Sequence, residues 1–346
     1  MIERELWHPV ATVDSVADRP SAVQLLQQDL VLWRDGIGHV HAWIDQCPHR
    51  GSRLSMGRVV GAVLECPYHG WQFDANAQLV KVPALPEFKP PAAHRARAYD
   101  VCEQYGLIWV RLQAAADRAS VDVTVDPTSL AAQRAEPPLF AAESELRLRK
   151  VSVGPYDVAT SAPRIVENFL DLAHFGFVHE HWLGARAEPA IADYQIESTA
   201  SGFVARGCRA WQPQSSIHAQ SGAMVEYTYE VNAPFTAILT KIPDQGSVAI
   251  SEFRESIALF VCPVEPEQSR IWFRLAMNDF VSPDSELASF QDTIFNQDKP
   301  ILESQRPKCL PLDPGAELHS AADKSSAAYR RLLRQWGIRF GVTNHD

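Results

Sequence analysis

Two short segments carry the strongest pattern in this sequence: Cys-Pro-His-Arg-Gly at residues 47–51 and Cys-Pro-Tyr-His-Gly-Trp at residues 66–71. In the spacing C-x-H, sixteen residues, C-x-x-H, the residues able to bind a metal are Cys47, His49, Cys66 and His69. A proline after each cysteine suits a tight loop, and a glycine near each histidine lets the backbone come close to a bound group. The pattern predicts that two loops bring two thiolates and two imidazoles to one metal centre.

A structural zinc site is the main competing interpretation of these four ligands, since zinc also binds cysteine and histidine. Zinc sites usually contain C-x-x-C or H-x-x-x-H pairs, and a C-x-H pair is unusual among them. In an iron–sulfur cluster, two imidazoles in place of two thiolates remove negative charge from one iron and raise its reduction potential. The four-ligand spacing and both flanking glycines favour the cluster.

A second pattern lies in residues 167–179, where Asp171 precedes His174 by three residues and His179 follows by five. On a regular helix five residues turn the chain by about 500°, which leaves the two histidines about 140° apart. They can share a ligand only if the helix is distorted, and Gly176 offers a place for a kink or a π-bulge. We therefore expect an irregular helix over 164–182. The alternative is an ordinary helix with two histidines at a packing interface.

A carboxylate that could complete this site lies in residues 290–305. Two imidazoles and one carboxylate form the facial triad of non-heme iron(II) oxygenases, which leaves positions open for oxygen and substrate. Three residues compete for the role: Asp292, Asp298 and Glu303. The pattern of residues alone does not choose among them.

Composition sets the broad class of the protein. The chain has 346 residues, 46% hydrophobic and 21% charged, which is enough for two globular domains. A net charge of −10 argues against binding along a nucleic-acid backbone. The charged start lacks the apolar core of a secretion signal, and no apolar run is long enough to span a membrane. Six cysteines do not make a disulfide scaffold here, so we expect a soluble protein of the reducing cytoplasm.

The first third of the chain has the pattern of short strands. Apolar runs at 31–33 and 39–43 flank an Asp-Gly turn, which indicates a hairpin. Residues 105–110 form another β-prone run, and the prolines of 82–91 predict an extended loop. An Ala-, Asp- and Pro-rich stretch at 114–138 indicates a domain boundary.

The rest of the chain alternates between the patterns of strands and helices. Strands are expected at 227–231, 249–263 and 270–278, and helices at 285–305 and 321–336. The predicted fold class is α+β, with helices packed on an antiparallel sheet.

Together these motifs resemble the oxygenase (alpha) subunit of Rieske non-heme iron oxygenases, and the resemblance covers nearly the whole chain. It implies an all-β Rieske [2Fe–2S] domain at 1–120. It also implies a catalytic domain at 121–346, a helix-grip-like antiparallel sheet covered by helices that holds mononuclear Fe(II). Cys47 and Cys66 would bind one iron of the cluster, and His49 and His69 the other.

The resemblance also assigns the second metal site. The iron ligands would be His174, His179 and Asp298, because the family's ligand aspartate lies five residues before a glutamate, as Asp298 does before Glu303. In this family three subunits form a ring, and an aspartate bridges the cluster of one subunit to the iron of the next. Here the resemblance gives that role to Asp171, between His69 of the adjacent chain and His174. Asn168 would lie near the pocket and act with Asp171 in catalysis.

Within the family, residues 171–184 are similar to those of the demethylase and monooxygenase branch, which includes caffeine-type N-demethylases and saxitoxin-type hydroxylases. The resemblance implies a homotrimeric terminal oxygenase that hydroxylates or demethylates a small aromatic, N-heterocyclic or alkaloid substrate with O2. No flavin or nicotinamide fingerprint occurs, so a separate NAD(P)H-dependent reductase, with or without a ferredoxin, must supply electrons. No nucleic-acid or membrane partner is expected. The alternatives are a cis-dihydroxylating ring dioxygenase, a Rieske electron-transfer protein without oxygenase activity, and a zinc-stabilised ligand-binding protein.

Overall fold

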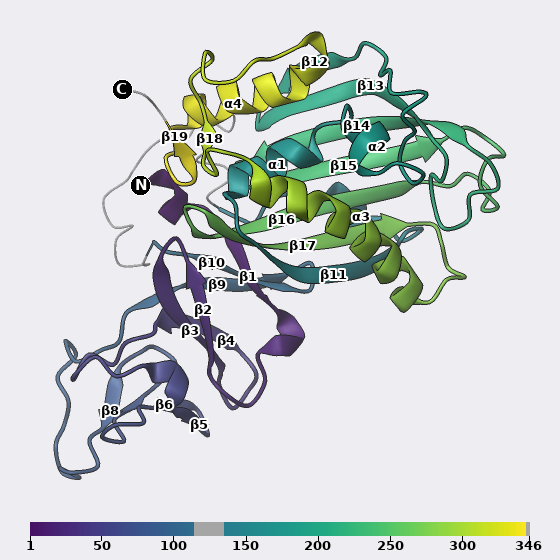
Figure 1. The fold of residues 1–346 in the computed structure, drawn as a ribbon. Coiled ribbons are helices and arrows are strands. Elements are labelled where there is room, and N and C mark those ends of the chain that lie inside the picture. Colours follow the sequence, from purple (N-terminus) through teal and green to yellow (C-terminus); the bar gives the residue numbers. More distant parts are fainter. Residues whose placement is uncertain (114–134, 344–346) are drawn as a thin grey trace. The chain divides into compact units, whose positions relative to one another are not determined.

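The computed structural model describes residues 1–113 and 135–343 (Figure 1). The chain forms two compact units, one of Ile2–Thr124 and one of Val125–Asp346 with Met1. The boundary expected between residues 120 and 121 lies outside the described residues. Among the helices of the described ranges, none has the length and apolar composition that a membrane crossing requires.

The N-terminal unit is built from two antiparallel sheets, as expected for an all-β domain. The six-stranded sheet has the order β1 (His8–Thr12), β10 (Leu107–Arg111), β9 (Ala98–Gln104), β4 (Val40–Ile44), β3 (Gln28–Arg34) and β2 (Ser21–Leu25). The four-stranded sheet has the order β5 (Arg58–Val60), β6 (Val63–Glu65), β7 (Gln72–Phe73) and β8 (Leu79–Lys81). Short 3-10 turns are η1 (Ile2–Glu5), η2 (Val13–Ser15) and η3 (Leu54–Met56).

The predicted hairpin is confirmed as β3 and β4, which pair with Trp33 opposite His41. Asp35 holds its turn, because its Oδ1 accepts hydrogen bonds from the backbone N–H groups of Ile37 and His39. Trp33 and Trp43 are fully buried, and their rings meet edge to face with centroids 5.0 Å apart. These aromatic rings form the core on which the two cysteine-containing loops rest.

The C-terminal unit is a seven-stranded antiparallel sheet with helices on one face (Figure 1), which confirms the α+β class. Its strand order is β11 (Arg149–Val158), β17 (Gln268–Met277), β16 (Glu255–Glu265), β15 (Thr236–Pro243), β14 (Ala223–Ala233), β13 (Gly202–Gln212) and β12 (Gln195–Thr199). The helices are α1 (Ala162–Phe169), α2 (Phe175–Val178), α3 (Asp284–Ser304) and α4 (Lys324–Trp336). Smaller elements are η6 (Ala141–Ser144), η7 (Ala321–Asp323), β18 (Leu310–Pro311) and β19 (Val342–Thr343).

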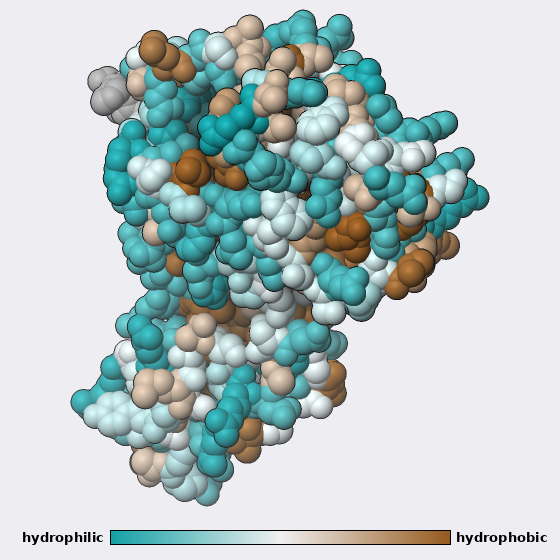
Figure 2. Space-filling view, turned by 45° about the vertical axis from the view of Figure 1, so that its right-hand side comes forward, coloured by the Kyte–Doolittle hydropathy of each residue, from teal (hydrophilic) through white to brown (hydrophobic). Residues whose placement is uncertain are grey.

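Two predicted elements differ from the structure. The strand expected at 249–263 begins only at Glu255, because residues 249–254 form a turn before β16. The helix expected over 164–182 is two helices, α1 and α2, separated by residues 170–174. On the face drawn in Figure 2, hydrophilic residues predominate and hydrophobic ones are interspersed, in keeping with the net charge of −10.

Candidate metal centres and substrate pocket

The break between α1 and α2 places the two histidines. Helix α1 begins at the cap Ser161, whose Oγ accepts a hydrogen bond from Arg164 N, and it ends at Phe169. Asp171 then accepts a hydrogen bond from Ala173 N at 2.9 Å through its side chain, and this local bond replaces helical hydrogen bonding. As a result, His174 and His179 stand at the two ends of the single-turn helix α2.

The sequence-based expectation of a distortion at Gly176 was wrong in position. The chain bends before His174, and Gly176 lies inside α2. What Gly176 does is allow close packing, since a Cβ atom there would lie 3.0 Å from the carbonyl oxygen of Ala185. The glycine is needed for backbone approach rather than for a kink.

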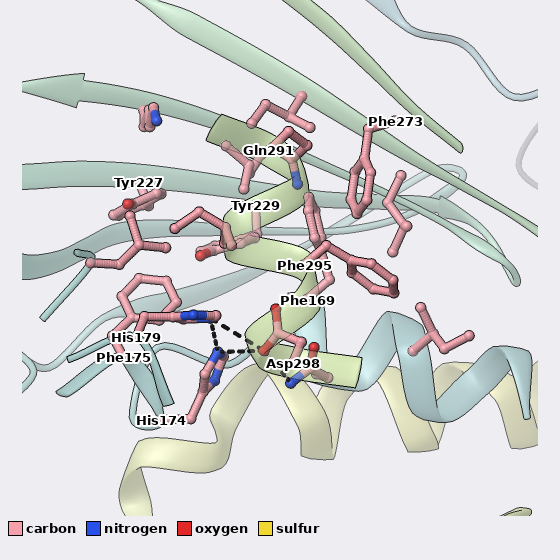
Figure 3. A pocket seen from close by; sticks show the side chains of 18 of the residues that line it. Phe169, His174, Phe175, His179, Tyr227, Tyr229, Phe273, Gln291, Phe295 and Asp298 are labelled. Atoms are coloured by element: carbon pink, nitrogen blue, oxygen red, sulfur yellow. Dashed lines mark hydrogen bonds and ion pairs between the residues drawn. The ribbon is translucent and has the colours of Figure 1, made fainter. Parts of the chain in front are cut away.

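Three side chains converge where α2 faces α3 (Figure 3): His174, His179 and Asp298. The two Nε2 atoms lie 3.2 Å apart. Asp298 Oδ1 lies 3.4 Å from Nε2 of His174 and 3.2 Å from Nε2 of His179. Three ligands on adjacent positions of one metal, with bonds of about 2.1 Å, stand about 3 Å apart, so this triangle has the size of a metal site.

Hydrogen bonds on the outer side fix the form of both imidazoles. Nδ1 of His174 donates to Asp171 Oδ2 at 3.0 Å, and Nδ1 of His179 donates to Gln297 Oε1 at 2.8 Å. In the neutral rings both Nε2 atoms therefore turn lone pairs toward each other and toward the Asp298 carboxylate. Three acceptors this close are stable only with a cation between them, so the donor set fits a divalent metal.

Local charges agree with a site built for a cation. Burial lowers the pKa of His174, but the hydrogen bond that His174 donates to Asp171 and the charge on Asp298 outweigh burial and leave that pKa raised. Burial likewise opposes ionisation of Asp171, yet its hydrogen bond with His174 leaves the Asp171 pKa lowered. The site thus favours positive charge at its centre.

The structure separates the three candidate carboxylates. Asp298 is buried beside the histidines, and its Oδ1 also accepts a hydrogen bond from Asn168 Nδ2 at 3.3 Å. Asp292 accepts a hydrogen bond from the hydroxyl of Tyr156. Glu303 accepts hydrogen bonds from Ala159 N at 3.0 Å and from Lys299 at 2.6 Å. Asp298 is the carboxylate that the fold brings to the two histidines.

The two cysteine-containing loops have matching backbone structures. Cys47 N donates to Ser52 O and Gly51 N to Cys47 O, while Cys66 N donates to Trp71 O and Gly70 N to Cys66 O. Gly51 and Gly70 have φ angles of 76° and 68°, a left-handed conformation that closes each turn.

The four side chains of these loops fall into two pairs. The rings of His49 and His69 lie with centroids 4.6 Å apart, and Cys66 is a hydrogen-bonding neighbour of the Cys47 thiol. Burial raises the pKa of Cys47 to about 12, against an opposing backbone hydrogen bond from His49, so its thiolate needs a bound metal.

This pairing bears on the zinc alternative. A tetrahedral zinc with bonds of 2.0–2.3 Å would draw four ligand atoms to within about 4 Å of one another. In the described residues, the group of metal-binding atoms that all lie within 4.8 Å is the His174, His179 and Asp298 group, and the four loop residues form no such group. A thiol pair and an imidazole pair fit the two irons of a [2Fe–2S] cluster.

A mainly apolar pocket opens beside His174, His179 and Asp298. Aromatic and aliphatic side chains from the sheet and from α1, α2 and α3 form its walls, among them Phe169, Phe175, Leu239, Ile257, Phe273 and Phe295. The polar residues include Asn168, Tyr227, Tyr229, Lys241 and Gln291. Of the contributors to this site, sequence reasoning missed Gln297 and Lys241, because neither belongs to a motif.

Comparison with known proteins agrees with these features. The Rieske [2Fe–2S] domain family matches residues 6–99, and the vanillate O-demethylase oxygenase C-terminal domain family matches residues 158–339. Methylxanthine N1-demethylase NdmA of Pseudomonas putida is 33% identical over 340 residues, covering 96% of this chain and 88% of that protein. Probable methylxanthine N7-demethylase NdmC of Pseudomonas sp. (strain TJI-51) is 39% identical over 241 residues, covering 69% and 78%.

The structure of Pseudomonas putida CBB5 NdmA with caffeine superposes with a TM-score of 0.79 at 31% identity, covering 96% of this chain and 90% of that one. These matches confirm the predicted family, the fold class and the two iron cofactors. They also support an oxidoreductase that acts on small organic substrates with a separate reductase. The chain belongs to the Rieske non-heme iron oxygenases, as a member that joins a Rieske [2Fe–2S] domain to an oxygenase domain of the vanillate O-demethylase type.

Proposed function

We propose that this oxygenase removes a methyl group, as formaldehyde, from a ring nitrogen of a flat N-heterocycle. The observation that carries the proposal is the aromatic pocket beside His174, His179 and Asp298, in a chain 33% identical to a methylxanthine N1-demethylase. Hydroxylation of an N-methyl carbon gives a hemiaminal, which breaks its C–N bond to release formaldehyde and the N–H product. O2, two electrons and two protons balance this reaction, and one oxygen atom leaves as water.

The proposed ligand roles follow the geometry. His174, His179 and Asp298 hold the mononuclear iron, and Cys47, His49, Cys66 and His69 hold the [2Fe–2S] cluster. When bound, the iron activates dioxygen and the cluster delivers the electrons. Asp171 and Gln297 keep Nδ1 of each imidazole protonated, so that each Nε2 faces the metal.

Asn168 has a positioning role in this proposal. Its Nδ2 donates to the same Asp298 oxygen that lies closest to both histidines, which holds the carboxylate in one orientation. The pocket side of the site is apolar, since the rings of Phe169, Phe273 and Phe295 surround the space where the substrate lies. Such walls hold a flat ring and exclude water from the reacting carbon.

The assembly is proposed from the resemblance to the family. Three chains form a ring, with domains of about residues 1–120 and 121–346, and Asp171 bridges His174 to the partner's His69. The electrons come from an NAD(P)H-dependent reductase, either directly or through a ferredoxin. A cytoplasmic setting is consistent with the six cysteines, which form no disulfide with one another.

A single turnover tests this function. The purified protein is reduced chemically under argon and then given O2 with methylated purines, methoxybenzoates, a guanidinium alkaloid or an unmethylated arene. Formaldehyde together with an N-demethylated product is the expected result for the purines. A product heavier by one oxygen without formaldehyde would make the enzyme a hydroxylase, and a cis-diol from the arene would make it a dioxygenase.

A further inference from the structure

One wall of the pocket carries a charged pair on a largely apolar face of the sheet. Lys241 on β15 lies directly opposite Glu255 on β16, and Nζ of Lys241 lies 2.5 Å from Oε2 of Glu255. Both residues are buried, with 5% and 8% of their surfaces exposed. The next positions on the same face of these strands are Leu239 and Ile257. A charged pair among aliphatic side chains requires an explanation.

Stability alone does not explain why this charged pair is buried. Removing two charges from water costs about as much as their attraction returns, and a well-packed hydrophobic pair of similar volume is often as stable or more so. A charged group kept in the apolar wall of a binding pocket is therefore a candidate for ligand recognition.

Of the two residues, Lys241 is the one that reaches the pocket. Lys241 lines both the pocket beside the iron ligands and a smaller neighbouring cavity that also contains Asp279, whereas Glu255 lines the smaller cavity and not the pocket. An ammonium group has three hydrogens, more than its ion pair with the single oxygen Oε2 of Glu255 can use. The ring of Phe290 also lies near Nζ, with its centroid 5.9 Å away. Lys241 therefore has hydrogens to donate to a molecule in the pocket.

Lys241 lies at the end of the pocket away from the iron ligands. Phe290 and Gln291, which line the pocket with Lys241, precede Asp298 on α3 by eight and seven residues. At a rise of 1.5 Å per residue they stand about 10–12 Å from Asp298 along the helix. Figure 3 shows Gln291 in the upper part of the view and Asp298 in the lower part, with Phe295 between them. A two-ring heterocycle with one methyl group at the iron would reach toward Lys241 with its other end.

Resting on the proposed function, we infer that Lys241, held by Glu255, donates a hydrogen bond to a carbonyl oxygen at the end of the substrate opposite the oxidised methyl group. The preferred substrate is an uncharged, flat heterocycle. Glu255 balances the charge of Lys241, so a carboxylate would lose its hydration without a net attraction. A cationic substrate would meet the ammonium group directly. The pair thus selects neutral carbonyl compounds.

The test needs a variant that leaves no charge buried alone. Lys241→Met keeps the length of the side chain but would strand Glu255, so it is combined with Glu255→Gln. The matched control is Arg209→Met with Glu226→Gln. Arg209 and Glu226 also face each other across two strands of this sheet, 3.8 Å apart, but both are exposed and outside the pocket lining.

Binding is measured by calorimetry on the oxidised holoenzyme without reductase, so that no turnover occurs. The probes are caffeine and its two analogues in which sulfur replaces the carbonyl oxygen at C2 or at C6, since sulfur is a weak acceptor. The wild type should bind caffeine at least about tenfold more tightly than one of the two analogues, as expected for a lost hydrogen bond to a charged donor. In the Lys241/Glu255 double variant this preference should disappear, while the Arg209/Glu226 variant keeps it. The size of sulfur affects both proteins alike and cancels in the comparison.

Caffeine that binds the double variant as tightly as the wild type, or that fails to bind the wild type, would overturn the inference. The proposed function is judged separately by formaldehyde in the single turnover. Lys241-dependent binding without formaldehyde would remove the demethylase assignment and keep the recognition site. Formaldehyde production with an unchanged KM in the double variant would keep the demethylase assignment and remove the recognition site. The expected pattern is a raised KM for caffeine with kcat nearly retained.

Discussion

The two candidate metal centres are built in opposite ways. In the N-terminal unit, each loop supplies one cysteine and one histidine within four residues, and its turn is closed by its own backbone hydrogen bonds. In the C-terminal unit, His174 and His179 stand at the ends of one short helix, and Asp298 comes from α3, more than a hundred residues later. The first centre is local in sequence, and the second depends on how α2 and α3 pack. The two should therefore fail independently when mutated.

The largest effect is expected from Asp298→Ala. Removing the carboxylate should abolish formaldehyde formation, because two imidazoles alone hold the mononuclear iron poorly. The visible absorption of the cluster should remain, since its ligands lie in the other unit. Single turnover and absorption spectra measure the two properties.

Asp292→Ala serves as the control for this variant, because Asp292 lies on the same helix and hydrogen-bonds Tyr156. It should keep its mononuclear iron. Turnover that survives in Asp298→Ala and is lost in Asp292→Ala would reverse the assignment.

The reciprocal variant is Cys66→Ala. Losing one thiolate should remove the cluster and its visible colour, while the iron site of the other unit still binds added Fe(II). Metal analysis after anaerobic reconstitution would show one iron per chain. Loss of both sites together would contradict the independence of the two centres.

A smaller effect is expected from Gln297→Leu. His179 would lose its Nδ1 hydrogen-bond acceptor, so its ring and tautomer would no longer be fixed. Iron affinity should fall by about 10–100-fold, the usual range for such outer contacts. A competition titration with a chelator measures it. Asn296→Leu, at the exposed neighbouring position, likewise replaces an amide by an apolar side chain and should leave the affinity unchanged.

The smallest effect concerns His8 on β1, which is buried and hydrogen-bonds Glu3 O through Nε2 at 2.7 Å. Burial lowers the pKa of His8 to about 4, although Glu3 opposes this. The unfolded chain therefore binds more protons between pH 6.5 and 4, and stability falls as the pH is lowered through this window. Lowering the pH from 7.5 to 5.5 should reduce the free energy of unfolding by roughly 1 kcal/mol through His8. Chemical unfolding of wild type and His8→Gln at both pH values tests this, and an equal loss in the two proteins would exclude His8 as the source.

The features that could be predicted from the sequence depend on residues close together in the chain, and those that could not depend on residues that meet only in the folded structure. The cluster ligands, the β3–β4 hairpin and the helices near α3 and α4 were visible, because each depends on residues that are neighbours in the chain. Asp298 could not be separated from Asp292 and Glu303 by spacing alone. That choice is made in three dimensions by Tyr156 and Lys299, which bind the other two carboxylates.

Other parts of the site could be predicted only in part or not at all. The spacing of the two histidines predicted an irregular helix but not the place of the break, which lies before His174 beside the hydrogen bond from Ala173 N to Asp171. Lys241 faces the pocket only because of the register of β15 against β16, and a shift by one residue would turn it to the opposite face. Register is not readable from a single sequence.

The most direct test of two separate iron centres is the iron and acid-labile sulfide content of the purified protein. A [2Fe–2S] cluster with a mononuclear site predicts three irons and two sulfides per chain, and the Asp298→Ala variant should keep two of each. Two irons and two sulfides in a wild type that takes up no further Fe(II) would mean that His174, His179 and Asp298 hold no iron. Zinc without sulfide would contradict the cluster itself.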